Sequence, residues 1–139
     1  PRPIHSARRH RSRIGHIKCD DDFFGNRCDL NCYMLKLNLI VIRTQNLAET
    51  VRWYQEIFDL HFLQEKHSDG VLHYSAILSE GVIEIYPTNK SALQITFGFA
   101  VNKEDFENIV SRINYKTIEE NLILLKDLNG NSIILSLEE

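Results

Sequence analysis

Residues 37–60, LNLIVIRTQNLAETVRWYQEIFDL, constrain the fold of this chain more than any other segment. A largely apolar run at 37–42 predicts a β-strand, and the polar residues at 44–46 break it. Asn46 stands three residues before Glu49, which is the reciprocal N-cap and N3 arrangement that begins a helix. The segment therefore predicts a strand, a capped turn and an amphipathic helix.

A second, weaker copy of this unit follows at residues 96–113. TFGFAV at 96–101 predicts a strand, Asn102 is the expected helix cap, and Asp105 stands at the N3 position. The helical stripe is made by Phe106, Ile109, Val110 and Ile113. The caps are 56 residues apart (102 minus 46), so the pattern indicates a duplicated supersecondary unit.

The remaining strands complete two βαβββ modules, which we expect at residues 34–87 and 93–139. Asn129–Gly130 is the clearest hairpin signal, and Pro87 ends a strand because it has no amide hydrogen to donate. In the first module we expect helix 47–60 and strands at 35–43, 62–66, 72–78 and 82–86. In the second we expect helix 103–113 and strands at 94–101, 116–118, 122–126 and 132–137. This order places the chain in the α+β class.

Length favours a single domain, and the net charge of that domain is negative. A chain of 139 residues suits one domain with a real core. The net charge of −3 gives no reason to expect nucleic acid or an anionic membrane as partner. No stretch approaches the roughly 20 apolar residues of a membrane span. We therefore expect a cytoplasmic protein.

Residues 1–33 differ in composition from the rest of the chain. They hold seven of the 16 Lys and Arg residues and all three cysteines, Cys19, Cys28 and Cys32, whose irregular spacing does not favour a zinc site. Met34, the only methionine, resembles a start site. We expect residues 1–33 to be a disordered or non-native extension, and the alternative is a genuine flexible arm.

Each predicted strand of the sheet has one apolar face and one small or polar face. Ile83 and Ile85 oppose Glu84 and Tyr86, and the strand at 94–101 alternates in the same way. The apolar faces should meet the helices. The other faces either line a cleft for a small organic ligand or look at solvent, as antiparallel sheets often do.

These residues resemble the vicinal oxygen chelate superfamily, which includes glyoxalases, extradiol dioxygenases, fosfomycin-modifying enzymes and bleomycin resistance proteins. The resemblance covers residues 35–138. It is carried by NLAETVRWYQEIFDL, by IEIYP at 83–87 and by DLNGNSIIL at 127–135. It implies paired modules that form a curved mixed sheet around a cleft, with helices on the outer face and commonly in a homodimer.

The resemblance also implies four positions for metal ligands. They fall on Leu39 (or, with a shift of one residue, Asn38), Glu84, Thr96 and Ile134. Glu84 is the only ordinary ligand among Leu39, Glu84, Thr96 and Ile134, whereas catalytic zinc needs about three protein ligands. We therefore predict no metal and no cofactor.

The ligand site is predicted on the strand faces opposite the helices. Glu84 recognises a cationic or donor-rich ligand, or acts as a general base; the alternative is a solvated side chain without a role. Tyr86 shares its face, and His73 is either a cleft residue or an ordinary strand histidine. The predicted ligand-binding residues are Leu39, His73, Glu84, Tyr86, Thr96, Gly98 and Ile134.

Three functions remain, and the weakest is a purely structural dimerisation module whose cleft is filled by its own side chains. The favoured one is a metal-free protein that binds and sequesters an aromatic or cationic small molecule, in the manner of the bleomycin resistance type, without catalysis. The alternative is a lyase or isomerase that uses Glu84 as base, or a metal enzyme that recruits His73 at a non-standard position.

Overall fold

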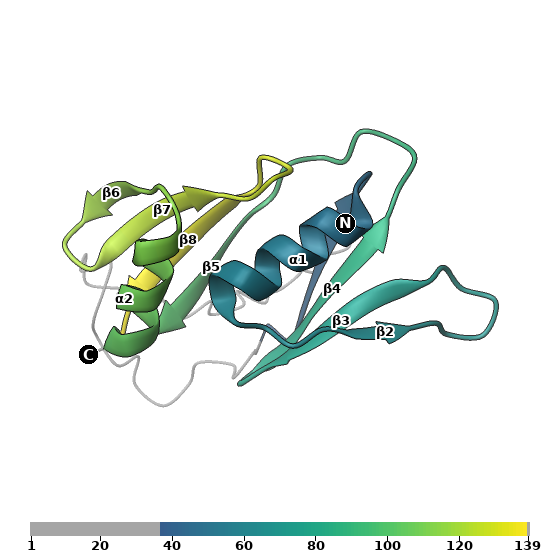
Figure 1. Cartoon of the computed structure of the whole chain (residues 1–139), viewed down its shortest axis with the longest axis horizontal. Helices are drawn as coiled ribbons and strands as arrows, with labels where there is room; N and C mark the ends of the chain where they lie inside the picture. The colour runs from purple at the N-terminus through teal and green to yellow at the C-terminus, as the bar shows by residue number, and fades with distance from the viewer. Residues whose placement is uncertain (1–36, 139) are drawn as a thin grey trace, which may run out of the picture. The chain divides into compact units, whose positions relative to one another are not determined.

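The computed structural model describes residues 37–138. The predictions about the extension at residues 1–33 and its cysteines lie outside the described residues. The first module contains β1 (Leu39–Thr44), α1 (Leu47–Phe58), β2 (Leu63–Glu65), β3 (His73–Leu78) and β4 (Gly81–Pro87). The second contains β5 (Thr96–Val101), α2 (Lys103–Arg112), β6 (Lys116–Glu119), β7 (Leu122–Lys126) and β8 (Ser132–Leu137) (Figure 1).

The two modules have the same sheet topology. The strand orders are β1-β4-β3-β2 and β5-β8-β7-β6. In each sheet the first and last strands of the module pair in parallel, and the other neighbours are antiparallel. The predicted α+β class with paired βαβββ modules is confirmed.

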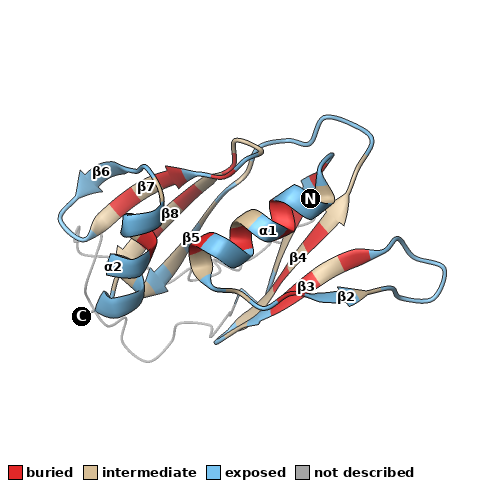
Figure 2. Ribbon diagram, in the orientation of Figure 1, coloured by how far each residue is buried: buried red, intermediate tan, exposed pale blue. Residues whose placement is uncertain are grey.

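Each sheet buries one face against a helix. Ile83 and Ile85 of β4 are fully buried, as are Ile133 and Leu135 of β8 (Figure 2). Helix α1 packs on β4, and α2 packs on β8. The opposite face of each sheet, called here the open face, carries the alternate residues. Most of them are partly or fully exposed, but His73 and Ser75 of β3 are buried.

Most element boundaries differ from the prediction by one or more residues, and two of the larger differences have local causes. Helix α1 ends at Phe58 because Asp59 adopts the left-handed conformation, with φ of 55°. Strand β2 has only three residues, and Ser68, with φ of 47°, turns the chain soon after it. Strand β1 begins at Leu39 rather than at residue 35.

The predicted helix caps differ in outcome. Asn102 caps α2 as expected, since its side-chain oxygen accepts a hydrogen bond of 2.9 Å from the amide of Asp105. At α1 the predicted reciprocal cap is wrong, because the Asn46 side chain makes no capping bond within residues 37–138. The Asn46 amide that Glu49 should have bound donates instead to Thr44 Oγ1 at 3.0 Å.

Thr44 belongs to a closed ring of three side chains that joins the modules. Its hydroxyl donates to Asn129 Oδ1 (2.8 Å), and the side-chain nitrogen of Asn129 donates to Thr50 Oγ1 (3.1 Å). The Thr44 and Thr50 oxygens lie 2.9 Å apart. Because the Thr44 hydrogen is used on Asn129, the Thr50 hydroxyl donates the third bond.

The carboxylate of Asp127 is the second polar junction between the modules. Its Oδ2 accepts bonds of 2.7 Å from the Tyr54 hydroxyl of α1 and from the Asn131 side chain. Its Oδ1 accepts bonds of 2.8 Å from the backbone amides of Asn129 and Asn131. Burial and the Asp127 charge raise the pKa of Tyr54 far above its ordinary value. The buried acid is therefore fully hydrogen-bonded, as a buried charge requires.

Neither helix in residues 37–138 is long enough to span a membrane, since α1 has 12 residues and α2 has 10.

Replacing Tyr54 by Phe removes one bond to the buried Asp127 carboxylate while it keeps the ring. We expect the free energy of unfolding to fall by about 1.5–3 kcal/mol, the usual worth of a hydrogen bond to a charged group. Urea unfolding measures it, with Tyr115→Phe as control because Tyr115 is exposed. Equal stability of the two variants would contradict a stabilising role for the hydrogen bond between Tyr54 and Asp127.

Candidate functional site

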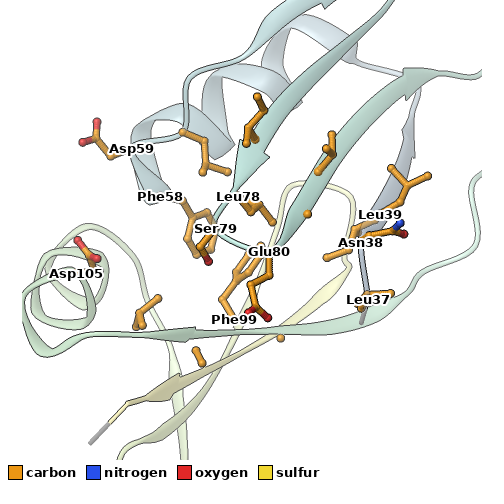
Figure 3. A pocket seen from close by; sticks show the side chains of 18 of the residues that line it. Leu37, Asn38, Leu39, Phe58, Asp59, Leu78, Ser79, Glu80, Phe99 and Asp105 are labelled. Carbon is orange, nitrogen blue, oxygen red and sulfur yellow. The ribbon is translucent and has the colours of Figure 1, made fainter. Parts of the chain in front are cut away.

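A hollow of about 820 Å³ opens where the two modules meet (Figure 3). It is lined by the start of β1, the end of α1, the β3–β4 turn, β5 and part of α2. The rings of Phe58 and Phe99, one from each module, form an edge contact at 5.3 Å in its wall. A volume of this order accommodates a small organic molecule.

The polar lining of the hollow is acidic. Four carboxylate side chains line it, those of Asp59, Glu80, Asp105 and Glu138, and three of them are labelled in Figure 3. Among the described residues that line it there is no lysine, arginine or histidine. The hollow therefore combines aromatic rings with negative charge. The sequence reading missed this set because its members come from element ends and turns rather than from strand faces.

The predicted site residues fall into separate groups. Leu39 and Gly98 line the hollow. Glu84, Tyr86 and His73 lie on the open face of the first sheet, beyond the hollow's lining. Thr96 and Ile134 lie on the open face of the second sheet, where Ile134 pairs with Gly98.

His73 and Tyr86 form a stack on the open face of the first sheet. Their rings are 7° from parallel with centroids 4.1 Å apart. The Arg43 guanidinium lies 5.7 Å from the centroid of the Tyr86 ring. Desolvation and the neighbouring Glu84 carboxylate raise the pKa of Tyr86, and Arg43 opposes them.

Two further residues join this group, and we call Glu65, His67, His73 and Glu84 the four-donor cluster. One ligating atom from each lies within 4.8 Å of the others. The sequence reading missed Glu65 and His67. The signal was present, because pairing of β2 with β3 sets Glu65 opposite His73 on the same face, but finding it required the strand register.

The metal positions implied by the resemblance do not fit a metal. Leu39 and Ile134 are apolar, and the residue directly opposite Glu84 on β1 is Val41. Thr96 pairs with Ser132 at an exposed place on the second sheet. These positions offer a single carboxylate, too few donors for a divalent ion.

The sequence and the structure agree on a family. Residues 36–133 match the family model described as the Glyoxalase/Bleomycin resistance protein/Dioxygenase superfamily. The chain belongs to this superfamily. No curated protein sequence matches the chain.

Solved structures share the fold at low sequence identity. The chain is similar to Oxidase ChaP-H2, with a TM-score of 0.63 and 14% identity over 77% of this chain and 96% of the other. It is also similar to a glyoxylase/bleomycin resistance protein/dioxygenase domain from Frankia sp. EAN1pec, with a TM-score of 0.59 and 16% identity over 77% and 100%. A fosfomycin resistance protein, FosX from Listeria monocytogenes, solved as a mutant with Mn(II), gives a TM-score of 0.59 and 13% identity over 74% and 92%.

The Tyr86 phenol provides a test of the electrostatics of this face. Replacing Glu84 by Gln removes a nearby negative charge, so the pKa of Tyr86 should fall toward its ordinary value. Replacing Arg43 by Gln should raise it. NMR titration of labelled tyrosine rings measures both. Shifts in the same direction in the two variants would contradict the arrangement.

Proposed function

We propose that this protein binds a small organic cation with an aromatic or apolar part in the hollow and holds it without chemical change. The observation that carries this proposal is the lining, which has four carboxylates and, among the described residues, no basic side chain. The net negative charge of this lining would attract a cation that enters the hollow and repel an anion.

The aromatic lining supports the same class of ligand. Phe58 and Phe99 offer ring surface to an apolar group or, through the ring face, to a cation. The four acidic residues are all exposed, so each charge pair is worth only about 1 kcal/mol or less. Selectivity for cations would therefore come from several weak attractions together with apolar burial.

The lining favours binding over catalysis. It contains neither histidine nor cysteine in the described part of the chain, and its carboxylates are exposed rather than held in an apolar surrounding of the kind that prepares a general base. The superfamily's metal positions are largely apolar here. A resistance or sequestration role follows from these features more directly than turnover does.

A second candidate function is a lyase or isomerase that uses Glu84 as base. It is favoured by one observation, the grouping of Glu84 with the His73–Tyr86 stack, which places three proton-exchanging groups together. Release of a product from a bound ligand, lost in Glu84→Gln, would establish it in place of simple binding.

Two further properties are proposed with this function. A homodimer would cover apolar side chains on the open face of the first sheet, where Ile77 is 82% exposed and Leu63 is 54% exposed. A cytoplasmic location is proposed from the sequence alone.

Ligand class is tested with three probes of one shape. We expect 1-naphthylmethylamine, a cation at neutral pH, to bind more tightly than the neutral 1-naphthalenemethanol. The anion 1-naphthoate should bind weakest. Calorimetry measures the three affinities, and added salt should narrow the differences because exposed charges are screened. Equal or tighter binding of the anion would contradict the proposal.

The acids of the hollow are tested by the double variant Asp59→Asn, Glu80→Gln. Asn tolerates the left-handed backbone at position 59, so the fold should be kept. We expect the preference for amine over alcohol to fall by roughly fivefold, about 1 kcal/mol. The matched control is Asp69→Asn, Glu119→Gln, which removes the same charge outside the hollow's lining. An equal loss in the control would show that only net charge matters.

A further inference from the structure

We propose that the four-donor cluster, Glu65, His67, His73 and Glu84, binds a divalent transition-metal ion of the zinc type. Only Glu84 coincides with a metal position implied by the resemblance. The other three donors come from β2, from the turn after it and from β3. A metal here would replace the sequence-based prediction that the protein has none.

The strand register explains why the donors converge. Glu65 of β2 pairs with His73 of β3, and Glu84 of β4 pairs with Ser75, two residues after His73 on the same face. The turn at Ser68 and Asp69 brings His67 back toward His73, so that their ring centroids lie 5.1 Å apart. Three adjacent segments therefore place their donors on one patch of the open face.

His73 is the observation that points to a ligand. Its side chain is only 1% exposed, and its Nε2 has no hydrogen-bond partner among residues 37–138. Its Nδ1 lies 3.1 Å from the carbonyl oxygen of Val71 and therefore donates the ring hydrogen to it. In the neutral imidazole with its hydrogen on Nδ1, Nε2 carries an unprotonated lone pair. This nitrogen lies near the carboxylates of Glu65 and Glu84.

This arrangement is the one in which histidine binds metals. Ligating histidines almost always donate the second ring nitrogen to a carbonyl or carboxylate, which fixes the tautomer. Here Val71 supplies the carbonyl, and the Tyr86 ring stacked on His73 fixes the ring plane. A buried nitrogen without a partner is otherwise costly, and a bound cation would remove that cost.

The distances suit a site that contracts slightly around an ion. His73 Nε2 lies 3.8 Å from Glu65 Oε2 and 4.0 Å from Glu84 Oε1, and His67 Nε2 lies 3.7 Å from Glu65 Oε2. These separations are too long for hydrogen bonds. Four ligands about 2.1 Å from a tetrahedral ion stand roughly 3.4 Å apart. Because the four donor atoms lie within 4.8 Å of one another, the widest pair would have to close by at most about 1.4 Å to complete the site.

Charge and access agree with a divalent ion. Two carboxylates and two neutral imidazoles balance a charge of +2, and this nitrogen and oxygen donor set suits zinc and its first-row neighbours. The His67 and Glu65 side chains are 70% and 38% exposed. They can adjust to the ion and leave it a path from solvent.

The metal site and the proposed ligand hollow are independent. None of the four donors lines the hollow, although Val82, which does, stands two residues before Glu84 on the same face of β4. Loss of metal binding would leave the selectivity for cations to be measured separately.

The test uses the full chain with Cys19, Cys28 and Cys32 changed to Ser, so that their thiols bind no metal. After treatment with a chelator, zinc is titrated by calorimetry, and cobalt is titrated by its visible absorption. His67→Ala is compared with His61→Ala, since His61 is an exposed histidine outside the cluster. Glu65→Gln is compared with Glu119→Gln, which removes a carboxylate on β6. The histidines of residues 1–33 are common to all variants and cancel.

We expect one zinc ion that is held by the parent and by both controls. Zinc affinity should fall at least tenfold in His67→Ala and in Glu65→Gln. Losing even an outer partner of a metal site costs roughly this much affinity. Zinc should also raise the melting temperature of the parent more than that of His67→Ala. Equal zinc affinity in His67→Ala and His61→Ala would overturn the proposal.

A direct readout does not depend on substitution. Imidazole nitrogen NMR of the parent should show the Nε2 resonance of His73 shifting when one equivalent of zinc is added. Zinc that binds while this resonance stays unchanged would place the ion elsewhere and overturn the proposal, as would the absence of zinc binding.

Discussion

The buried carboxylate of Asp127 is the interaction on which the rest of the structure depends. It stands in the loop between β7 and β8, and it accepts bonds from Tyr54 of the other module and from its own loop. A buried charge with four donors is tolerated, whereas the same charge with one donor missing is costly. The carboxylate therefore couples the shape of the second module's loop to the position of α1.

The position of α1 in turn sets the hollow. Phe58 and Asp59 stand at the carboxyl end of the same helix that carries Tyr54, and both contribute to the lining. The edge contact between Phe58 and Phe99 belongs to the same junction. One polar contact at the middle of the helix and one aromatic contact at its end thus hold the two modules around the proposed binding site.

Local and non-local interactions explain what the sequence could predict. The cap of α2 is confirmed because Asn102 and Asp105 are three residues apart and need nothing else. The predicted cap of α1 is wrong because the backbone amide of Asn46 donates to the Thr44 hydroxyl. That hydroxyl is held in place by Asn129, 85 residues away in the chain. The bond from Tyr54 to Asp127 spans 73 residues. Strand alternation identified the face of Glu84 and Tyr86, but not Glu65 and His67, whose approach to His73 depends on pairing register.

The ring formed by Thr44, Thr50 and Asn129 bears on how the chain reaches its native state. The first module is contiguous in sequence, yet the start of its helix is completed by an asparagine that is synthesised long after it. An isolated first module would expose the hydroxyls of both threonines to water. The two modules therefore share one topology, but the first does not complete its own hydrogen bonds without the second. We expect the two modules to fold and to unfold as one cooperative unit.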